Sequence, residues 1–257
     1  MLLDRACFFI YDNYCFSMVS NFEGFLAEYA QHSAQINGIE EGDFSKFDMS
    51  QGDSVLHWDK NRHVGVMNRH NYALLFWLDY FVSTGEKPIL VHVDGHQDLA
   101  EPSQYLSKAD VKQIDHVAKY VDNIEVKEFI KPAAKLGLVK EIELFGSENT
   151  FENFENAINL ARDRRVIFDL DLDVYTTSPF VVEEYNSEAQ RERGISYRDS
   201  YESFAELMHL SDLTTVAFSP DYLRGNENEV VRHFRNIRSE YDEVSSKGLF
   251  GKVRKFF

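Results

Sequence analysis

Apolar and polar residues follow two different periods along the chain. In residues 71–83, apolar side chains fall at positions 74, 75, 78, 81 and 82, which is the spacing of one face of an α-helix. The same kind of spacing predicts further helices over residues 22–35, 108–120, 151–163, 197–210 and 228–241. Short apolar runs predict strands over residues 6–11, 64–67, 89–94, 124–129, 139–145, 165–169 and 213–219.

Continuous apolar strands that alternate with helices are typical of a parallel sheet covered on both faces. We therefore expect an α/β protein with three α/β/α layers and a mostly parallel central sheet. No repeat, low-complexity stretch or linker rich in Pro, Gly or Ser interrupts residues 1–257, which predicts one domain. In such sheets, ligands bind at the carboxyl ends of the strands.

Acidic and imidazole side chains cluster at two predicted strand ends and at one junction between a strand and a helix. They recur at every second position, so side chains of one series share a face of the strand. Each uncompensated charge in such a place is costly. The candidate metal ligands are His70, Asp94, His96, Asp98, Asp169 and Asp171.

This set of side chains has the chemistry of a site for two divalent cations. Four carboxylates would repel one another without metal, and their charge balances two divalent ions. Carboxylates with some imidazole and no thiolate favour Mn²⁺ or a similar ion over structural zinc. Two-metal sites activate water for hydrolysis. The second acidic series, Asp169, Asp171 and Asp173, contains two possible ligand pairs. We favour Asp169 and Asp171, because they directly follow the apolar run; Asp171 and Asp173 are the alternative frame.

Two of these motifs resemble those of the superfamily of arginases, agmatinases and formiminoglutamases. Asp94-Gly-His-Gln-Asp98 resembles its DAHxD motif, and Phe168-Asp-Leu-Asp171 resembles its SFDxD segment. His70 precedes Asp94 by 24 residues, similar to the first metal-binding His of that superfamily. The resemblance implies that Asp94 and Asp169 bridge two Mn²⁺ ions. It also implies that His70 and Asp98 complete one coordination shell, and that His96 and Asp171 complete the other.

The chain is most similar to the arginase-like proteins that act on peptides. The resemblance implies that arginine residues of a ribosomally made precursor peptide are converted to ornithine with release of urea. Met67-Asn-Arg-His-Asn71 stands in place of the glycine-rich GGDHS context. The segment after Asp98 lacks the loop with which free-arginine enzymes hold the α-amino and α-carboxylate groups. That loss suits an arginine whose backbone is already in peptide bonds.

The remaining roles implied by the resemblance have several candidates. The late-strand Glu that pairs with the guanidinium in arginases has no counterpart in residues 215–221, so Glu101, Asp173 and Asp221 are the candidates for substrate binding. His116 falls in the region of the arginase proton-shuttle His and is the candidate catalytic residue. His92 is given no role, although it flanks the site.

Three other functions compete with this interpretation. A single-zinc amide deacetylase of the related deacetylase family uses an Asp-x-His and one later Asp. A haloacid-dehalogenase-type phosphatase is suggested by Phe168-Asp-Leu-Asp171, although the Gly-Thr turn that normally follows is absent. A non-catalytic protein that keeps the fold and the metals is the third. Metal content distinguishes the classes: two Mn-type ions, one zinc, one magnesium or none.

Charge and composition restrict the partners. The formal net charge of -16 disfavours nucleic acid and favours cationic substrates and metals. No apolar run approaches the roughly 20 residues needed to span a bilayer, so we expect no membrane association. The two cysteines, Cys7 and Cys15, lack metal-type spacing and predict free thiols in a cytoplasmic protein. Arginase relatives commonly assemble, so an oligomer is compatible with the resemblance.

Overall fold

The computed structural model describes residues 26, 29–36, 38–47, 55–146, 154–223 and 225–246. The predicted strand at residues 6–11 and both cysteines lie outside these ranges. The strands are β1 Gly38–Glu41, β2 Val55–Asp59, β3 Val64–Met67, β4 Ile89–Val93, β5 Glu141–Phe145, β6 Val166–Asp171, β7 Val181–Val182, β8 Ile195–Ser196 and β9 Leu213–Ala217. The α-helices are α3 Ala73–Thr84, α4 Ile114–Asn123, α5 Ile130–Leu136, α6 Phe154–Asp163, α7 Val174–Thr177, α8 Glu188–Arg193, α9 Tyr197–Leu210 and α10 Glu227–Ser246.

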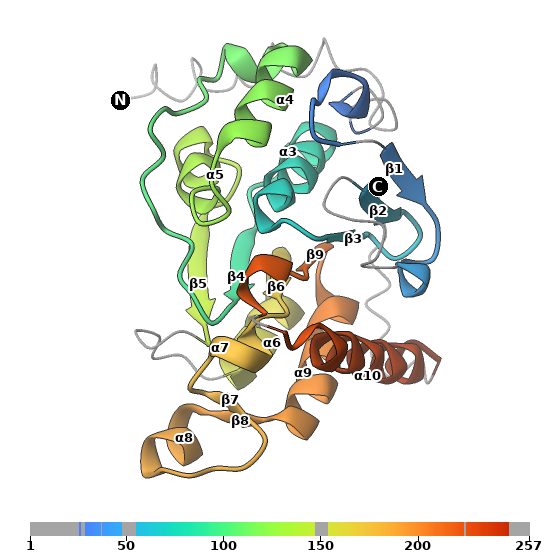
Figure 1. The fold of residues 1–257 in the computed structure, drawn as a ribbon, viewed down its shortest axis with the longest axis vertical. Helices are drawn as coiled ribbons and strands as arrows, with labels where there is room; N and C mark the ends of the chain where they lie inside the picture. The colour runs from blue at the N-terminus through green and yellow to red at the C-terminus, as the bar shows by residue number, and fades with distance from the viewer. Residues whose placement is uncertain are drawn as a thin grey trace.

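A seven-stranded sheet with the order β1-β2-β3-β9-β6-β4-β5 runs through the middle of the molecule (Figure 1). Its strands pair in parallel except β2 and β3, which are antiparallel. This confirms the expected α/β class with a mostly parallel sheet. Because β9, β6 and β4 are neighbours, their carboxyl ends meet at one edge of the sheet.

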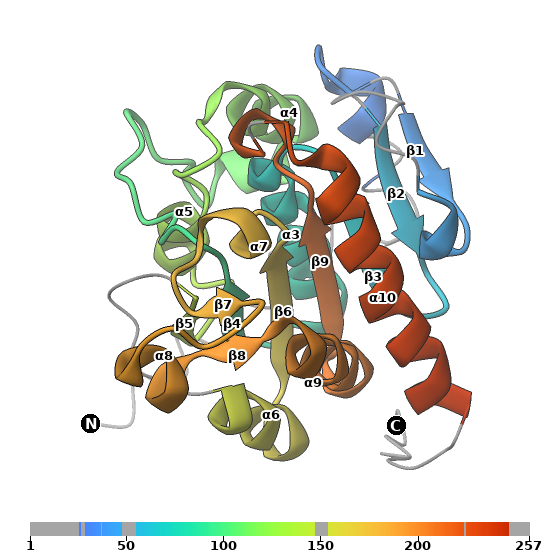
Figure 2. The same ribbon diagram turned by 60° about the horizontal axis from the view of Figure 1, so that its bottom comes forward.

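Two hydrophobic cores cover the two faces of the sheet. One core joins α3, α4 and α5 to alternate strand residues such as Leu90, Ile167 and Leu213. The other joins α6, α9 and α10 to the intervening residues, such as Val91 and Phe168. Figure 2 shows α9 and α10 in front of the sheet and α3 behind it. The expected three layers are therefore present.

The register of the strands aligns three polar side chains inside the sheet. His92 of β4 is paired with Asp169 of β6, and Asp169 is paired with Thr215 of β9. Each lies two residues after a strand residue of the α3 core, so all three side chains point to the face that α3 covers. The sheet thus carries a polar row beneath its carboxyl edge.

Most predicted elements are present, but some predictions were wrong. Residues 124–129 are not a strand: Ile124 and Phe129 are buried, and the chain between them forms turns. The strand predicted to end at residue 169 continues to Asp171 as β6. The short strands β1 and β2, at one edge of the sheet, were not predicted. Within the described part of the chain, no helix combines the length and the apolar character that crossing a bilayer requires.

Candidate metal centre

Asp94 lies at the centre of a buried cluster at the carboxyl end of β4. Its Oδ1 accepts a 2.7 Å hydrogen bond from the backbone N–H of His96 and lies 3.4 Å from His96 Nδ1. Its Oδ2 faces two other imidazoles, 3.7 Å from His70 Nδ1 and 3.4 Å from His92 Nε2. The two oxygens of one carboxylate therefore point to different histidines.

His70 connects Asp94 to Asp98 and Asp171. It begins the short 3₁₀ helix η3 (His70–Tyr72), which leads into α3. Its Nδ1 lies 3.0 Å from Asp171 Oδ2 and 3.3 Å from Asp98 Oδ2. Because β6 ends at Asp171, this carboxylate stands at the carboxyl end of its strand, next to the end of β4.

Asp173 and His96 form the part of the cluster nearest to solvent. His96 Nδ1 lies 3.1 Å from Asp173 Oδ2, and the His96 side chain is 45% exposed whereas Asp173 is buried. The backbone N–H of Asp173 donates a 3.0 Å hydrogen bond to Asp171 Oδ1. The second acidic series therefore contributes Asp171 and Asp173 to the same cluster as Asp94.

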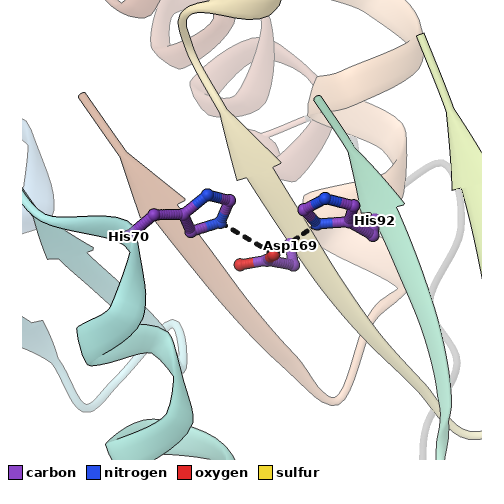
Figure 3. Close-up of side chains that lie close together, drawn as sticks. All are labelled: His70, His92 and Asp169. Atoms are coloured by element: carbon purple, nitrogen blue, oxygen red, sulfur yellow. Dashed lines mark hydrogen bonds and ion pairs between the residues drawn. The ribbon is translucent and has the colours of Figure 1, made fainter. Parts of the chain in front are cut away.

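Asp169 occupies a different position from the one expected of a bridging ligand. Figure 3 shows its carboxylate between the rings of His70 and His92. Its Oδ2 is 2.9 Å from His70 Nε2 and 2.7 Å from His92 Nδ1, and its Oδ1 accepts a 2.5 Å hydrogen bond from Thr215 Oγ1. The physical reason is the length of β6, which places Asp169 two residues inside the sheet and Asp171 at its edge.

His92 belongs to this cluster, although we assigned it no role from the sequence. It is fully buried and contacts Asp169 and Asp94 through its two ring nitrogens. The sequence did contain a signal for it. His92 has the same parity as Asp94 in β4, so its side chain points to the same face of the strand.

The cluster has room and ligand atoms for cations. Within the described residues, four buried atoms of this cluster have no hydrogen-bond partner: His70 Nδ1, His92 Nε2, Asp94 Oδ2 and Asp173 Oδ2. Buried polar atoms are rarely left in this state, and a bound cation would satisfy them. Ligand atoms lie within 4.8 Å of one another in each of four groups, namely His70–His92–Asp169, His70–Asp94–Asp171, His92–Asp94–Asp98 and Asp94–His96–Asp173.

Protons on the imidazoles balance the carboxylates when no cation is bound. Hydrogen bonding to Asp173 and then to Asp94 raises the pKa of His96 to about 11. Burial lowers the pKa of His92, but its contacts with Asp169 and Asp94 outweigh burial and raise it to about 9.

The pKa values of the buried carboxylates shift in two directions, down for Asp169 and up for Asp98 and Asp173. Burial opposes ionisation of Asp169, yet the charges and hydrogen bonds of His70 and His92 bring its pKa down to about 2. Burial raises the pKa of Asp98 to about 6, and burial with the neighbouring Asp171 raises the pKa of Asp173 well above its ordinary value. Carboxylates held this close together ionise fully only when positive charge lies between them.

An open pocket of about 560 Å³ lies over the solvent side of the cluster. Its lining includes Asp98, Asp171, Asp173, His96, Lys127, Ser219 and Tyr222. Tyr222 is 37% exposed, and its ring centroid lies 5.3 Å from that of His96. The pocket thus joins the acidic cluster to an exposed aromatic ring.

Three of the residues proposed from the sequence do not line this pocket. His116 is exposed on α4, where its Nδ1 lies 3.0 Å from Asp110 Oδ1. Glu101 is exposed, forms a 2.7 Å ion pair with Lys131 and accepts a hydrogen bond from Tyr105. Asp221 is exposed in the short 3₁₀ helix η5 (Pro220–Tyr222), beside the pocket-lining Tyr222. Of the substrate-binding candidates, Asp173 alone is among the pocket-lining residues of the described chain.

Comparison with known proteins gives no match to a protein-family model and none to a curated protein. Similar solved structures include a hypothetical agmatinase from Burkholderia thailandensis, with 12% identity, a TM-score of 0.46 and coverage of 84% of this chain and 76% of that one. Proclavaminate amidino hydrolase from Streptomyces clavuligerus has 13% identity and a TM-score of 0.43, with coverage of 68% of this chain and 61% of that one. Arginase from Medicago truncatula has 11% identity and a TM-score of 0.41, with coverage of 74% of this chain and 61% of that one. The chain is similar to these proteins at low identity.

Proposed function

We propose that this protein is a metal-dependent hydrolase that binds two divalent cations around Asp94. The observation that carries the proposal is the set of buried atoms without hydrogen-bond partners, among them Asp94 Oδ2, His70 Nδ1 and Asp173 Oδ2, beneath an open pocket. A solvent-exposed acidic patch would have no need to gather buried donors and acceptors that face one another in ion-pair contacts without forming hydrogen bonds. A pair of cations satisfies these atoms and the charge of the carboxylates together.

The ligand groups favour the second frame of the acidic series. One cation would be held by His70, Asp94 and Asp171, with Asp98 3.3 Å from His70 Nδ1, and the other by Asp94, His96 and Asp173. Asp94 is common to both groups and is thus our proposed shared ligand. The charge of Asp171 raises the pKa of Asp173, so these two carboxylates lie close together, one in each group. Asp171 and Asp173 take the place that the first frame gave to Asp169 and Asp171. Mn²⁺ is the proposed metal because the ligands are mainly carboxylates.

Three carboxylates and one lysine, Lys127, line the pocket, and this acidic balance supports a cationic substrate. We propose the guanidinium of an arginine residue in a peptide, which water hydrolyses to ornithine and urea by breaking one C–N bond. When bound, the two cations would polarise the substrate and activate the water. Tyr222, whose ring lies beside that of His96, would stack on the planar face of the guanidinium. Ser219 holds Asp171 in place through a 2.5 Å hydrogen bond.

An arginine within a peptide, rather than free arginine, is supported by the sequence that follows Asp98, which lacks the loop that holds the free amino acid. The pocket is also open to solvent at Tyr222, so a chain on both sides of the arginine has room. A phosphatase that uses Asp169 as nucleophile is disfavoured, because Asp169 is fully buried and both of its oxygens accept hydrogen bonds.

The test is to incubate the full-length protein with Mn²⁺ and an arginine-containing peptide, and to weigh the product by mass spectrometry. The proposal predicts the mass loss of one CH₂N₂ unit per arginine, with stoichiometric urea. Free arginine should react far more slowly, and Asp171→Asn should abolish turnover. Metal binding without any turnover of peptides or small guanidines would reject hydrolysis of guanidines while leaving the metal centre standing.

A further inference from the structure

His70 and His92 form a matched pair of rings around one carboxylate oxygen. The ring centroids are 5.4 Å apart and the planes are inclined by 26°. Asp169 Oδ2 lies within hydrogen-bond distance of His70 Nε2 and His92 Nδ1, as Figure 3 shows. An ionised carboxylate only accepts hydrogen bonds, so the hydrogen of each ring sits on the nitrogen that faces Asp169.

The opposite nitrogen of each ring is consequently the one with a free lone pair when the ring is neutral. These nitrogens, His70 Nδ1 and His92 Nε2, are both buried and have no hydrogen-bond partner among the described residues. Both face Asp94 Oδ2, at 3.7 Å and 3.4 Å. His92 also lies in a group of ligand atoms with Asp94 and Asp98. His92 therefore shares with His70 the contact to Asp169 on one ring nitrogen and to Asp94 on the other, while His70 Nδ1 also lies 3.0 Å from Asp171 Oδ2.

We propose that His92 is a metal ligand through Nε2 and that Asp169 is a positioning residue that orients both imidazoles toward the metal centre. This inference rests on the proposed metal centre and adds to it a ligand and an orienting carboxylate. Metal-bound histidines commonly donate their other N–H to a carboxylate, which fixes the tautomer and the orientation of the ring. Here one oxygen of Asp169 would do so for two rings.

Asp169 is itself held in place by a chain of hydrogen bonds. Thr215 Oγ1 donates to Asp169 Oδ1 at 2.5 Å, and Trp77 Nε1 donates to Thr215 Oγ1 at 3.2 Å. These residues are buried between the sheet and α3, and the ring of Phe129 packs 4.6 Å from that of His70. The orienting carboxylate thus belongs to the buried core between the sheet and α3.

The experiment observes the ring nitrogens of the intact protein by NMR after labelling histidine with ¹⁵N. Zn²⁺, which is diamagnetic, is added in steps and binding is followed in parallel by calorimetry; the His92→Asn variant assigns the signals. We expect the His92 Nε2 resonance to shift in proportion to occupancy and His92 Nδ1 to keep its hydrogen. The exposed His32 serves as the control histidine, whose signals should not change.

Variants give a second readout that is independent of the assignment. Asp169→Asn should lower the Zn²⁺ affinity about 10- to 100-fold, the usual effect of losing such an orienting group. His92→Asn should lower it at least as much, and His32→Ala should leave it unchanged. Zn²⁺ binding with an unshifted His92 Nε2 would overturn the inference and leave the proposed function intact. The absence of any divalent-cation binding by the wild-type protein would overturn both.

Discussion

Ser219 donates a 2.5 Å hydrogen bond from its hydroxyl to Asp171 Oδ2 while its own backbone is left-handed, with φ of 45° and ψ of 56°. A residue with a Cβ is disfavoured in this conformation, and such strain is typically found at functional sites. The chain turns here from β9 into η5, which brings the hydroxyl over the end of the neighbouring strand β6. The turn therefore helps to position the Asp171 carboxylate, which we propose as a metal ligand.

The two contributions of Ser219 can be separated with two substitutions. Ser219→Ala removes the hydroxyl and keeps the backbone strain, whereas Ser219→Gly removes both. We expect Ser219→Gly to be more stable than Ser219→Ala by about 1 kcal/mol, because glycine adopts the left-handed region freely. Both variants should bind Mn²⁺ more weakly than the wild type. Chemical denaturation and metal titration measure the two effects, and equal stability of the variants would argue against strain at this position.

Gly95 permits the close approach of α7 to the Asp94 loop. A Cβ at position 95 would lie 1.8 Å from Thr177 Oγ1 and 2.8 Å from Thr177 Cβ, so Gly95→Ala must displace α7. Thr177 Oγ1 donates to the backbone carbonyl of Asp173, so Asp173 should move with the helix. We predict that Gly95→Ala loses one of two bound cations, the one held by Asp94, His96 and Asp173.

Elemental analysis after dialysis against Mn²⁺ measures this loss. Gly38→Ala is the control, because a Cβ at position 38 meets no atom within 4 Å. Adding Thr177→Ala to Gly95→Ala removes the shortest contact and should restore part of the second equivalent. Full metal content in Gly95→Ala itself would show that α7 does not position a ligand.

We predict that the buried Asp79 makes the stability of the protein depend on pH, independently of the metal centre. Asp79 lies inside α3, is buried, and its Oδ1 has no hydrogen-bond partner among the described residues. Burial raises its pKa to about 9, whereas the same carboxyl in the unfolded chain ionises near pH 4. Between these values the unfolded chain releases a proton that the folded chain retains, so stability is lost as the pH rises from about 4 to about 9.

Asp79→Asn keeps the size of the side chain and removes its titration. At pH 8 the variant should be more stable than the wild type, by an amount that shrinks toward zero as the pH approaches 4. Urea denaturation at several pH values measures the two free energies of unfolding. A stability difference that stays constant over this range would mean that Asp79 does not titrate in it.

The sequence predicted those elements in which the pattern of apolar residues matches the residues that are buried in the structure. Strand β3 and helix α9 were predicted with the bounds that the structure has, because β3 is a short run buried at every residue and α9 buries one face at helical spacing. The strand predicted at residues 124–129 is wrong. Ile124 and Phe129 are buried although the chain between them forms turns, and the spacing of apolar residues does not distinguish such buried turns from a strand. Strands β1 and β2 are short, and β1 carries Glu40 and Glu41 on an edge, so no apolar run marks them.

The site was predictable in its residue types but less so in its geometry. The motifs led to His70, Asp94, His96, Asp98 and Asp171, and the structure brings these together. The predicted role of Asp169 depended on where β6 ends. Because the strand continues to Asp171, Asp169 lies inside the sheet and Asp173 lies in one group with Asp94 and His96. His92 was missed because a histidine inside an apolar strand looks like a core residue until its neighbours in β6 are known. Register between strands is set by tertiary pairing, which one strand's sequence does not contain.

The central claim is that two cations lie between these strand ends, and anomalous diffraction from crystals soaked in Mn²⁺ tests it most directly. The account predicts two manganese peaks in each chain. One should lie among His70, Asp94 and Asp171, the other among Asp94, His96 and Asp173, and Asp169 should contact neither. A map with no anomalous peak at the cluster, in protein that keeps its fold in Mn²⁺, would contradict the account.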